Sequence, residues 1–416
     1  MKSFIRWTGS RSRTWWLFLG IALCLTRGPS ISAEDKPAEV KVLYTFSRSQ
    51  NDGSNPQGTL LAGSDGALYG MTTAGGADRQ GTVFKLSKDG TGYQVLHSFQ
   101  ATGNDGRGPL AGVIEAQDGW LYGVTEGGGA SGAGTIFKIG KDGSGYRVVH
   151  TFAEWGGIRD DGRKPYGPLT QSKGGALFGT TTMGGAYTYG TVFRLNTNGT
   201  DYRILHHFGR GLAGDAKNPH GALLQASDGD LYGTTTAGPQ LQGGAGTVFA
   251  ISEEGGQYRL IHAFPNGPHD GARPYAGLIE GSDGKLYGTT VAGGQGSRGV
   301  VFRLNKDGTV YEILRAFSGF GADGWNPYGA VVEGKDGALY GTTLGGGPDG
   351  GGLVFRLSRD GRDYRTLFAF TQRGLEGRGP YAGLILAGDD AFYGATCAGT
   401  GDSLGTVFCL KLPPKP

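Results

Sequence analysis

The chain has 416 residues, of which 84 are glycine and 17 proline, so one residue in four favours turns over regular structure. This length excludes a mini-protein held together by disulfides, and it predicts two or three domains unless repeats close the chain into one unit. The formal net charge of +3 gives no indication of a nucleic-acid or anionic-membrane partner.

Residues 1–33 predict a secretory signal peptide. They start with basic residues, continue with an apolar run over residues 15–25, and end in the small-residue sequence 31–33. The run is too short to span a bilayer, so we expect cleavage near Ala33, a secreted or periplasmic protein, and no transmembrane segment in the mature chain. An uncleaved anchor is the alternative. The segment holds five of the 39 basic residues and none of the 36 acidic ones, which leaves the mature chain at −2.

One short motif then recurs seven times: an apolar residue, tyrosine or phenylalanine, and glycine, at intervals of 53 to 56 residues. The aromatic residues of this motif are Tyr69, Tyr122, Phe178, Tyr232, Tyr287, Tyr340 and Tyr393. A threonine follows three positions after each of them, and a phenylalanine follows further along. Recurrence of this kind indicates one supersecondary unit copied seven times.

Each copy predicts four short strands. In the fifth copy they are residues 277–281, 286–290, 300–304 and 311–317. Asp-Gly pairs follow the first and third strands and predict tight hairpins in which both central residues adopt a positive φ. Apolar residues alternate along the strands, and no sustained helical period occurs in the mature chain. Four antiparallel strands in about 54 residues are typical of a β-propeller blade.

The two ends of the repeat region predict a closed ring. Residues 40–46 match the fourth strand of other copies, such as residues 93–99, whereas the last copy ends after its third strand at residues 406–410. We expect residues 40–46 to pair into the last blade, which removes an open sheet edge. The predicted fold is all-β: one seven-bladed propeller over residues 34–412, followed by a tail at 413–416. An open solenoid would need capping repeats, and none is visible.

The repeat resembles a known family. The sequence Leu-Tyr-Gly-Thr-Thr at residues 231–235, followed by Gly-Thr-Val-Phe at 246–249, is similar to the GloVer tandem repeat of bacterial exported proteins. The resemblance covers essentially all of residues 40–412. It implies a secreted bacterial repeat protein, and it implies no catalytic residues.

Most repeated residues have a structural interpretation. Two phenylalanine positions, which use 14 of the 20 phenylalanines, are expected to pack neighbouring blades together. The glycine after each second-strand aromatic residue predicts the close approach of a ring or backbone. The repeated threonine is expected to bond a turn backbone. His97, His150, His206 and His262 share a fourth-strand position that other copies fill with Tyr, Arg or Phe, which favours a structural role.

The mature chain has two cysteines, Cys397 and Cys409, on the second and third predicted strands of the last blade. These strands are neighbours, and export favours oxidation, so a disulfide is expected, with free buried thiols as the alternative. Without a clustered histidine the pair is a poor zinc site, and no metal or other cofactor is predicted.

The fourth-to-first and second-to-third loops are the long ones. Both are expected on one face, which makes that face around the central channel the predicted site. The residue after the loop proline is expected to line the channel mouth, and in chain order it is Gln57, Leu110, Tyr166, His220, Tyr275, Tyr328 and Tyr381. Two positions before the proline stand Ser54, Arg107, Arg163, Lys217, Ala272, Trp325 and Arg378.

This rim is rich in tyrosine and basic residues. Tyrosine stacks on sugars and bonds their hydroxyls, and basic neighbours such as Arg163 suit acidic sugars. The tyrosines would alternatively plug the channel or pack between blades. The third copy adds Trp155, Tyr187 and Tyr189, which with Tyr166 predict an exposed aromatic cluster.

Three functions remain open from the sequence. The first is a monomeric protein that binds a polysaccharide or another extracellular ligand. The second is a polysaccharide lyase or glycoside hydrolase. Its acid, base and charge-neutralising groups would come from His220, His269, Arg273 and Tyr275, or from two of Asp160, Asp161, Asp270 and Asp323. The third is a scaffold of the cell envelope.

Overall fold

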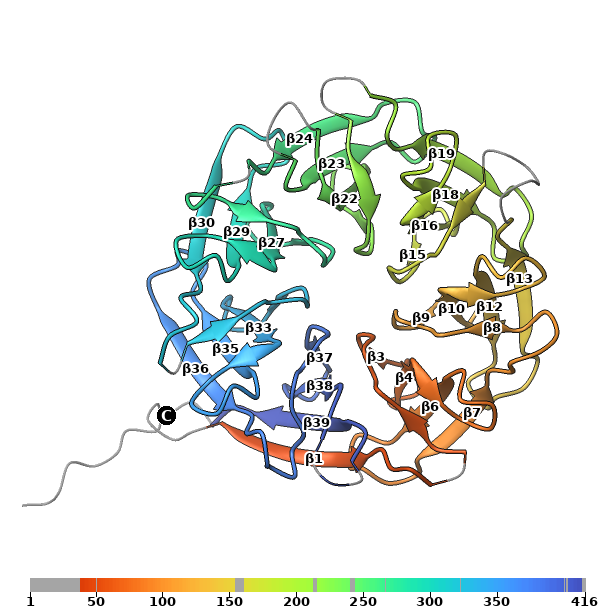
Figure 1. The fold of residues 1–416 in the computed structure, drawn as a ribbon, viewed down its shortest axis with the longest axis horizontal. Helices are drawn as coiled ribbons and strands as arrows, with labels where there is room; N and C mark the ends of the chain where they lie inside the picture. Colours follow the sequence, from red (N-terminus) through yellow and green to blue (C-terminus); the bar gives the residue numbers. More distant parts are fainter. Residues whose placement is uncertain are drawn as a thin grey trace, which may run out of the picture. The chain divides into compact units, whose positions relative to one another are not determined.

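The computed structural model describes residues 38–49, 51–153, 161–211, 215–239, 244–265, 267–321, 323–399, 401 and 403–413. Residues Pro37–Pro413 form one compact unit. Its described residues form strands and turns and contain no helix. Figure 1 shows these strands grouped in seven small sheets arranged as a ring. The predicted seven-bladed β-propeller is therefore confirmed.

Every blade runs from an innermost to an outermost strand, numbered first to fourth, with antiparallel neighbours. The first strands are β3 (Leu61–Ala62), β9 (Ile114–Glu115), β15 (Thr170–Gln171), β21 (Leu224–Gln225), β26 (Ile279–Glu280), β32 (Val332–Glu333) and β37 (Ile385–Leu386). The second strands are β4 (Leu68–Thr72), β10 (Leu121–Thr125), β16 (Leu177–Thr181), β22 (Leu231–Ala237), β27 (Leu286–Thr290), β33 (Leu339–Thr343) and β38 (Phe392–Thr396). The third strands are β6 (Thr82–Leu86), β12 (Thr135–Ile139), β18 (Thr191–Leu195), β23 (Thr247–Ile251), β29 (Val300–Leu304), β35 (Leu353–Leu357) and β39 (Thr406–Lys411). The fourth strands are β7 (Gln94–Ser98), β13 (Arg147–Thr151), β19 (Arg203–His207), β24 (Arg259–Ala263), β30 (Tyr311–Ala316), β36 (Tyr364–Ala369) and β1 (Glu39–Thr45).

The first strands are shorter than predicted. β26 pairs with β27 through Ile279 and Glu280 alone, whereas the sequence suggested residues 277–281. The physical reason lies at Gly277, where an added Cβ would stand 2.7 Å from the backbone oxygen of Ala222 in the previous blade. Residues at the start of this segment therefore pack against the neighbouring blade instead of extending the ladder.

The ring closes through its N-terminal strand. β1 pairs antiparallel with β39, so that Glu39 faces Lys411 and Thr45 faces Thr406. Figure 1 shows β1 lying along the outer side of β39 in the last blade. The seventh blade is thus assembled from both ends of the described chain, as predicted, and β1 pairs with the edge of β39 that would otherwise be open.

Neighbouring blades meet through the repeated phenylalanines. In all seven interfaces a fourth-strand ring contacts a third-strand ring of the next blade at 5.2 to 5.5 Å between centroids, in an edge-to-face arrangement. Phe46 contacts Phe84 between the seventh and first blades, and Phe370 contacts Phe408 between the sixth and seventh blades. All these rings are buried, which confirms their predicted packing role.

The second-strand glycine and threonine also behave as predicted. A Cβ added at Gly288 would lie 2.5 Å from the ring of Phe302, and the six equivalent glycines give 2.4 to 2.6 Å. The hydroxyl of Thr290 donates to the carbonyl of Ala292 at 2.8 Å, and every equivalent threonine makes the same bond at 2.8 to 3.4 Å. The glycine therefore admits a ring, and the threonine holds the turn that follows.

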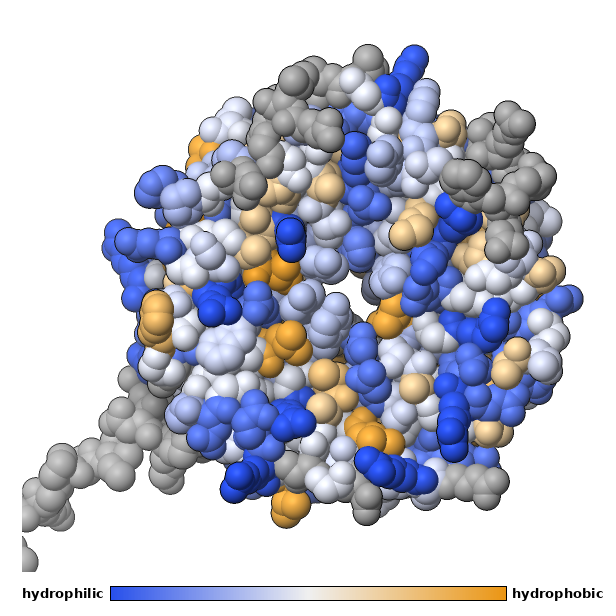
Figure 2. Space-filling model, in the orientation of Figure 1, coloured by the Kyte–Doolittle hydropathy of each residue, from blue (hydrophilic) through white to orange (hydrophobic). Residues whose placement is uncertain are grey.

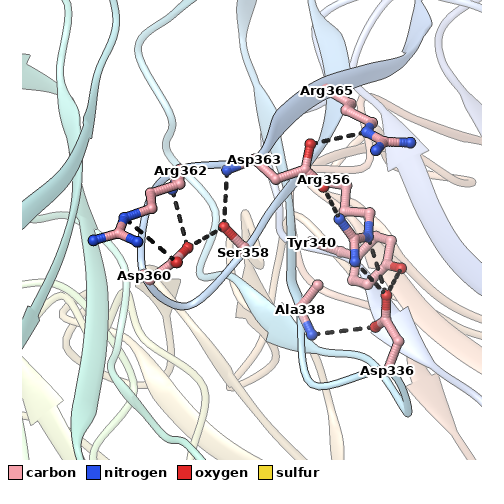
Figure 3. Close-up of polar contacts among 9 residues, drawn as sticks. All are labelled: Asp336, Ala338, Tyr340, Arg356, Ser358, Asp360, Arg362, Asp363 and Arg365. Atoms are coloured by element: carbon pink, nitrogen blue, oxygen red, sulfur yellow. Dashed lines mark hydrogen bonds and ion pairs between the residues drawn. The ribbon is translucent and has the colours of Figure 1, made fainter.

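The Asp-Gly turns differ from the prediction. In the first blade Gly66 has a φ of +83°, but Asp65 is not among the residues of positive φ, so only one central residue adopts that conformation. The Asp65 carboxylate instead accepts a bond from the Tyr69 hydroxyl at 2.7 Å. Figure 3 shows the equivalent contact in the sixth blade, where Asp336 accepts from Tyr340 and from Arg356. The aspartate therefore contributes a side-chain hydrogen bond, and the glycine contributes the positive φ of the turn.

The two kinds of long loop lie together on one face, as expected. In most blades they pair as two-residue ladders. These are β2 (Gly53–Ser54) with β5 (Ala74–Gly75), β8 (Gly106–Arg107) with β11 (Gly127–Gly128), β14 (Gly162–Arg163) with β17 (Met183–Gly184), β25 (Gly271–Ala272) with β28 (Ala292–Gly293), and β31 (Gly324–Trp325) with β34 (Gly345–Gly346). In the fourth blade β20 (Lys217–Pro219) pairs directly with the longer β22. We call this side of the ring the long-loop face.

Candidate functional site

The seven residues that follow the loop prolines meet around the ring axis. They line a central cavity of about 440 Å³ together with the small residues that come after them. In chain order the seven are Gln57, Leu110, Tyr166, His220, Tyr275, Tyr328 and Tyr381. Figure 2 shows the hollow at the centre of the ring. The sequence therefore identified the residues that the fold gathers at the channel.

A repeated backbone feature directs these side chains inward. The residue before each proline has a left-handed φ between 55° and 65°, and these residues are Asn55, Gly108, Lys164, Asn218, Arg273, Asn326 and Gly379. The Arg273 amide donates to the carbonyl of Ala245 in the previous blade, and the Arg273 carbonyl accepts from Val291 in its own blade. Each turn is thereby fixed to two blades before the chain reaches the channel.

Five consecutive positions carry rings, and we call them the aromatic collar: Tyr166, His220, Tyr275, Tyr328 and Tyr381. Successive ring centroids are 5.1, 4.8, 5.2 and 4.5 Å apart. The rings of Tyr328 and Tyr381 are stacked, those of Tyr275 and Tyr328 meet edge to face, and the other two pairs are tilted. All five side chains are half-buried, so they support one another while part of each ring remains accessible.

His220 stands in the collar as a neutral imidazole. Burial lowers its pKa, while its bond to the backbone carbonyl of Asn218 acts in the opposite direction. Its Nδ1 lies 3.0 Å from that carbonyl oxygen. Because a carbonyl only accepts, Nδ1 carries the proton, and Nε2 is left as a hydrogen-bond acceptor. The collar therefore combines one acceptor nitrogen with four tyrosine hydroxyls.

One residue that bonds the collar was not identified by the sequence analysis. The Glu126 carboxylate accepts bonds at 2.9 Å from both the Tyr166 hydroxyl and the Lys164 ammonium. Glu126 follows the repeated threonine, where other blades carry Thr, Val, Leu or Cys. A charged residue at a position that is uncharged in the six other blades was the sequence signal that could have identified Glu126. Burial, followed by the bond to Glu126, raises the pKa of Tyr166, so its hydroxyl stays protonated and donates.

The other predicted site residues lie outside the collar. Arg163 and Trp325 are half-buried in the long-loop ladders, and the Arg298 guanidinium stands 5.7 Å from the Trp325 ring centroid. Tyr187 and Tyr189 are exposed on a second-to-third loop, where the Lys217 ammonium lies 4.2 Å from the Tyr189 ring centroid.

The predicted cluster of the third blade is thus divided. Tyr166 belongs to the collar and contacts His220, whereas Tyr187 and Tyr189 lie on the outer loop. Trp155 and Asp160 fall outside the described residues, as do the predicted signal peptide and its expected cleavage site.

The remaining candidate carboxylates are engaged between blades. Asp270 lies 3.3 Å from Nε2 of His262, whose ring stacks on Tyr311 at 4.0 Å, and its other oxygen accepts from the Gly271 amide. Asp323 likewise accepts from Tyr364 and pairs with Arg315. Asp161 holds the same position beside Tyr202. These carboxylates are structural, so they do not form the facing pair that a hydrolase would need in the channel.

The expected disulfide is not formed, because both Cys397 and Cys409 are free thiols. Cys409 faces Tyr393 in the ladder, while Cys397 follows Thr396, which faces Thr406. An offset of four residues along neighbouring strands separates the cysteines by about 13 Å. A disulfide requires Cα atoms within about 7 Å. The strands were correctly predicted as neighbours, and the register keeps the cysteines apart.

Across the described part of the chain, no helix is long and apolar enough to cross a membrane. The same residues include no group of three or more His, Cys, Asp or Glu positioned to hold a metal ion.

Solved structures share the fold at low sequence identity. The extracellular domain of the putative one-component system BT4673 from B. thetaiotaomicron gives a TM-score of 0.58 at 10% identity, over 90% of this chain and 40% of that one. An oligogalacturonate lyase in complex with manganese gives 0.55 at 12% identity, over 91% and 97%. PorZ, a surface component of the type-IX secretion system of Porphyromonas gingivalis, gives 0.56 at 13%, over 87% and 47%. This chain thus spans about two fifths of the BT4673 domain.

None of the curated proteins matches the chain in sequence. A family model described as the Gloeobacter/Verrucomicrobia repeat matches it twice, over residues 30–244 and 218–415, so that the two matches overlap and span the whole ring.

Proposed function

This chain belongs to the Gloeobacter/Verrucomicrobia repeat family, and we propose that it is exported and binds a carbohydrate at the mouth of its central channel. The observation that carries the proposal is the aromatic collar around a cavity of about 440 Å³. Ligand pockets for small molecules commonly measure ~300–1,000 Å³. Aromatic faces stack on the apolar faces of sugar rings, and the hydroxyls at their edges bond sugar hydroxyls.

The polar groups of the collar suit such a ligand. Burial raises the pKa of Tyr381, so its hydroxyl stays protonated and can donate at neutral pH. The Tyr166 hydroxyl gives its proton to Glu126 and offers its oxygen as an acceptor. Nε2 of His220 supplies an acceptor. Sugar hydroxyls both donate and accept and can use both kinds of group. Because the rings already contact one another, little side-chain freedom is lost when a ligand binds.

The double variant Tyr275→Ala with Tyr328→Ala tests the proposal. We expect the affinity for a bound oligosaccharide to fall by at least about tenfold, because a stacking surface is lost, while the melting temperature changes little. Leu110→Ala is the matched control, since Leu110 occupies the same position on the non-aromatic side of the cavity. Isothermal titration calorimetry against a panel of neutral and acidic oligosaccharides gives the readout. Unchanged affinity in the double variant would reject the collar as the site.

A second candidate function is catalysis at the same mouth. It is favoured by the contact of Glu126 with Tyr166, and of Tyr166 with His220, which places a carboxylate and a neutral imidazole beside one cavity. The oligogalacturonate lyase among the structures of similar fold supports testing acidic polysaccharides first. New reducing or unsaturated ends would indicate turnover, and Glu126→Gln should abolish it. A polysaccharide that binds without any product would count against catalysis.

A further inference from the structure

Arg273, on the long-loop face next to the collar, carries a charge without a partner among the described residues. Lys164 stands before its proline and pairs with Glu126, whereas Arg273 holds the equivalent position in the fifth blade. The Arg273 side chain is exposed and makes no hydrogen bond or ion pair with any residue that the structure describes. It lies two residues before Tyr275 in the collar. At the equivalent position in the third blade, the Lys164 side chain reaches the carboxylate that bonds the collar residue Tyr166. Burial raises the pKa of Tyr328, and the charge of Arg273 opposes that rise.

The backbone conformation at position 273 does not favour arginine, and the side chain forms no hydrogen bond or ion pair with the described residues that would compensate. The φ of Arg273 is 57°, a left-handed conformation that favours glycine or asparagine over arginine. Asn218 and Asn326, at equivalent positions, use their amides to bond the carbonyls of Thr182 and Val291 in the preceding blade. Arg273 adopts the same conformation without such a contact. The residue is therefore poorly explained by the fold.

Several arginines on the opposite face are bound by carboxylates of the protein. On the opposite face, Arg356 contacts the carboxylates of Asp336 and Asp363, and Arg365 contacts Asp363 as well (Figure 3). Arg303 is bound to Glu312 in the same manner. Those guanidiniums have their acceptors within the protein, whereas the guanidinium of Arg273 has its five donors available to an outside anion.

We propose that Arg273 binds the acidic group of a sugar whose ring stacks on the aromatic collar, so that the ligand is an anionic polysaccharide, either a uronate or a sulfate ester. This inference rests on the proposed carbohydrate site and names its ligand class. A planar guanidinium forms two parallel bonds to a carboxylate or a sulfate, and that geometry fixes the orientation of the sugar as well as its charge.

The test compares Arg273→Asn with Arg79→Asn. Asparagine occupies the equivalent position in three other blades, so the first variant keeps a side chain that this backbone accepts. Arg79 is the matched control, because it is exposed, has a φ of 60°, and lies on the second-to-third loop of the first blade, which contributes no residue to the collar. The probes are oligogalacturonate, a sulfated galactan and a neutral galactan, each titrated calorimetrically against the purified protein.

We expect Arg273→Asn to weaken binding of an anionic probe by at least about tenfold and to leave a neutral probe unaffected. Arg79→Asn should change neither affinity. The probe that responds distinguishes carboxylate from sulfate. If the collar variant abolishes binding of every probe while Arg273→Asn binds anionic sugars normally, the inference is overturned and the carbohydrate site stands. If no probe binds the unaltered protein, both proposals are rejected.

Discussion

At the scale of single residues, the absence of a side chain at glycine allows rings and neighbouring backbone to pack closely. Gly288 admits the ring of Phe302, and Gly277 admits the backbone of the neighbouring blade. Gly66 instead supplies a positive φ in a turn. The first two reasons recur in all seven repeats and the third in six, with Asp390 in the seventh, which explains the high glycine content.

The first of these reasons gives a stability prediction. Gly288→Ala would place a Cβ 2.5 Å from the Phe302 ring and 2.7 Å from Leu278, so the buried ring must shift. We expect a loss of about 1–3 kcal/mol in the free energy of unfolding. Gly256→Ala is the control, because a Cβ added there would meet nothing within 4 Å and its φ is not positive. Denaturant unfolding measures both variants, and equal stability would show that the close contact is easily relieved.

At the scale of elements, a polar stack joins the outer strands of neighbouring blades. A fourth-strand side chain lies against a tyrosine of the next blade, and an aspartate bonds the pair, as His97, Tyr146 and Asp105 do. Tyr44 and Arg315 take the place of histidine in two other interfaces. Histidine, tyrosine and arginine each present a flat group to the tyrosine, which explains why the residue at this position varies.

His150 makes the stability of one such interface dependent on pH. Burial lowers the pKa of His150 below its ordinary value of 6.5, and Asp161 opposes this effect. The folded protein therefore takes up the proton less readily than the unfolded chain. The contribution of neutral His150 to stability is complete above pH 6.5 and is lost as the pH falls below it.

His150→Phe should reduce this dependence, since phenylalanine cannot be protonated and Phe368 already fills the equivalent position in the sixth blade. We expect the melting temperature of the variant to fall less than that of the unaltered protein between about pH 8 and about pH 5. His269→Asn is the control, because His269 is exposed in a loop. If the melting temperatures of the His150 variant and the unaltered protein depended on pH in the same way, His150 would not contribute to the pH dependence of stability.

At the scale of the whole molecule, stability depends on closing the ring. The seven phenylalanine contacts are nearly identical. One of them, between Phe46 and Phe84, involves the residue that directly follows the N-terminal strand β1. Loss of that contact opens an interface without removing any blade. The ring should therefore respond to a change at Phe46 as one cooperative unit.

Phe46→Ala tests this closure. The ring is fully buried between Phe84 and Tyr93, so its removal should lower the free energy of unfolding by about 3–5 kcal/mol. Phe320→Ala serves as the control, because that side chain is 81% exposed, and its change should stay within about 0.5 kcal/mol. Thermal unfolding followed by fluorescence and by circular dichroism should give one coincident transition. A small effect at Phe46 would mean that β1 is not required for closure.

The sequence by itself determined the blade, the number of blades, the closing strand and the ring of residues at the channel. These features repeat in the chain, and each copy specifies the same local pattern of strands and turns. It did not reveal that Glu126 bonds Tyr166, that Cys397 and Cys409 lie four residues out of register, or that Asp161, Asp270 and Asp323 are engaged between blades. Only the tertiary structure decided these points, because each depends on how neighbouring strands or blades are set against each other, and that geometry is absent from the spacing along one chain.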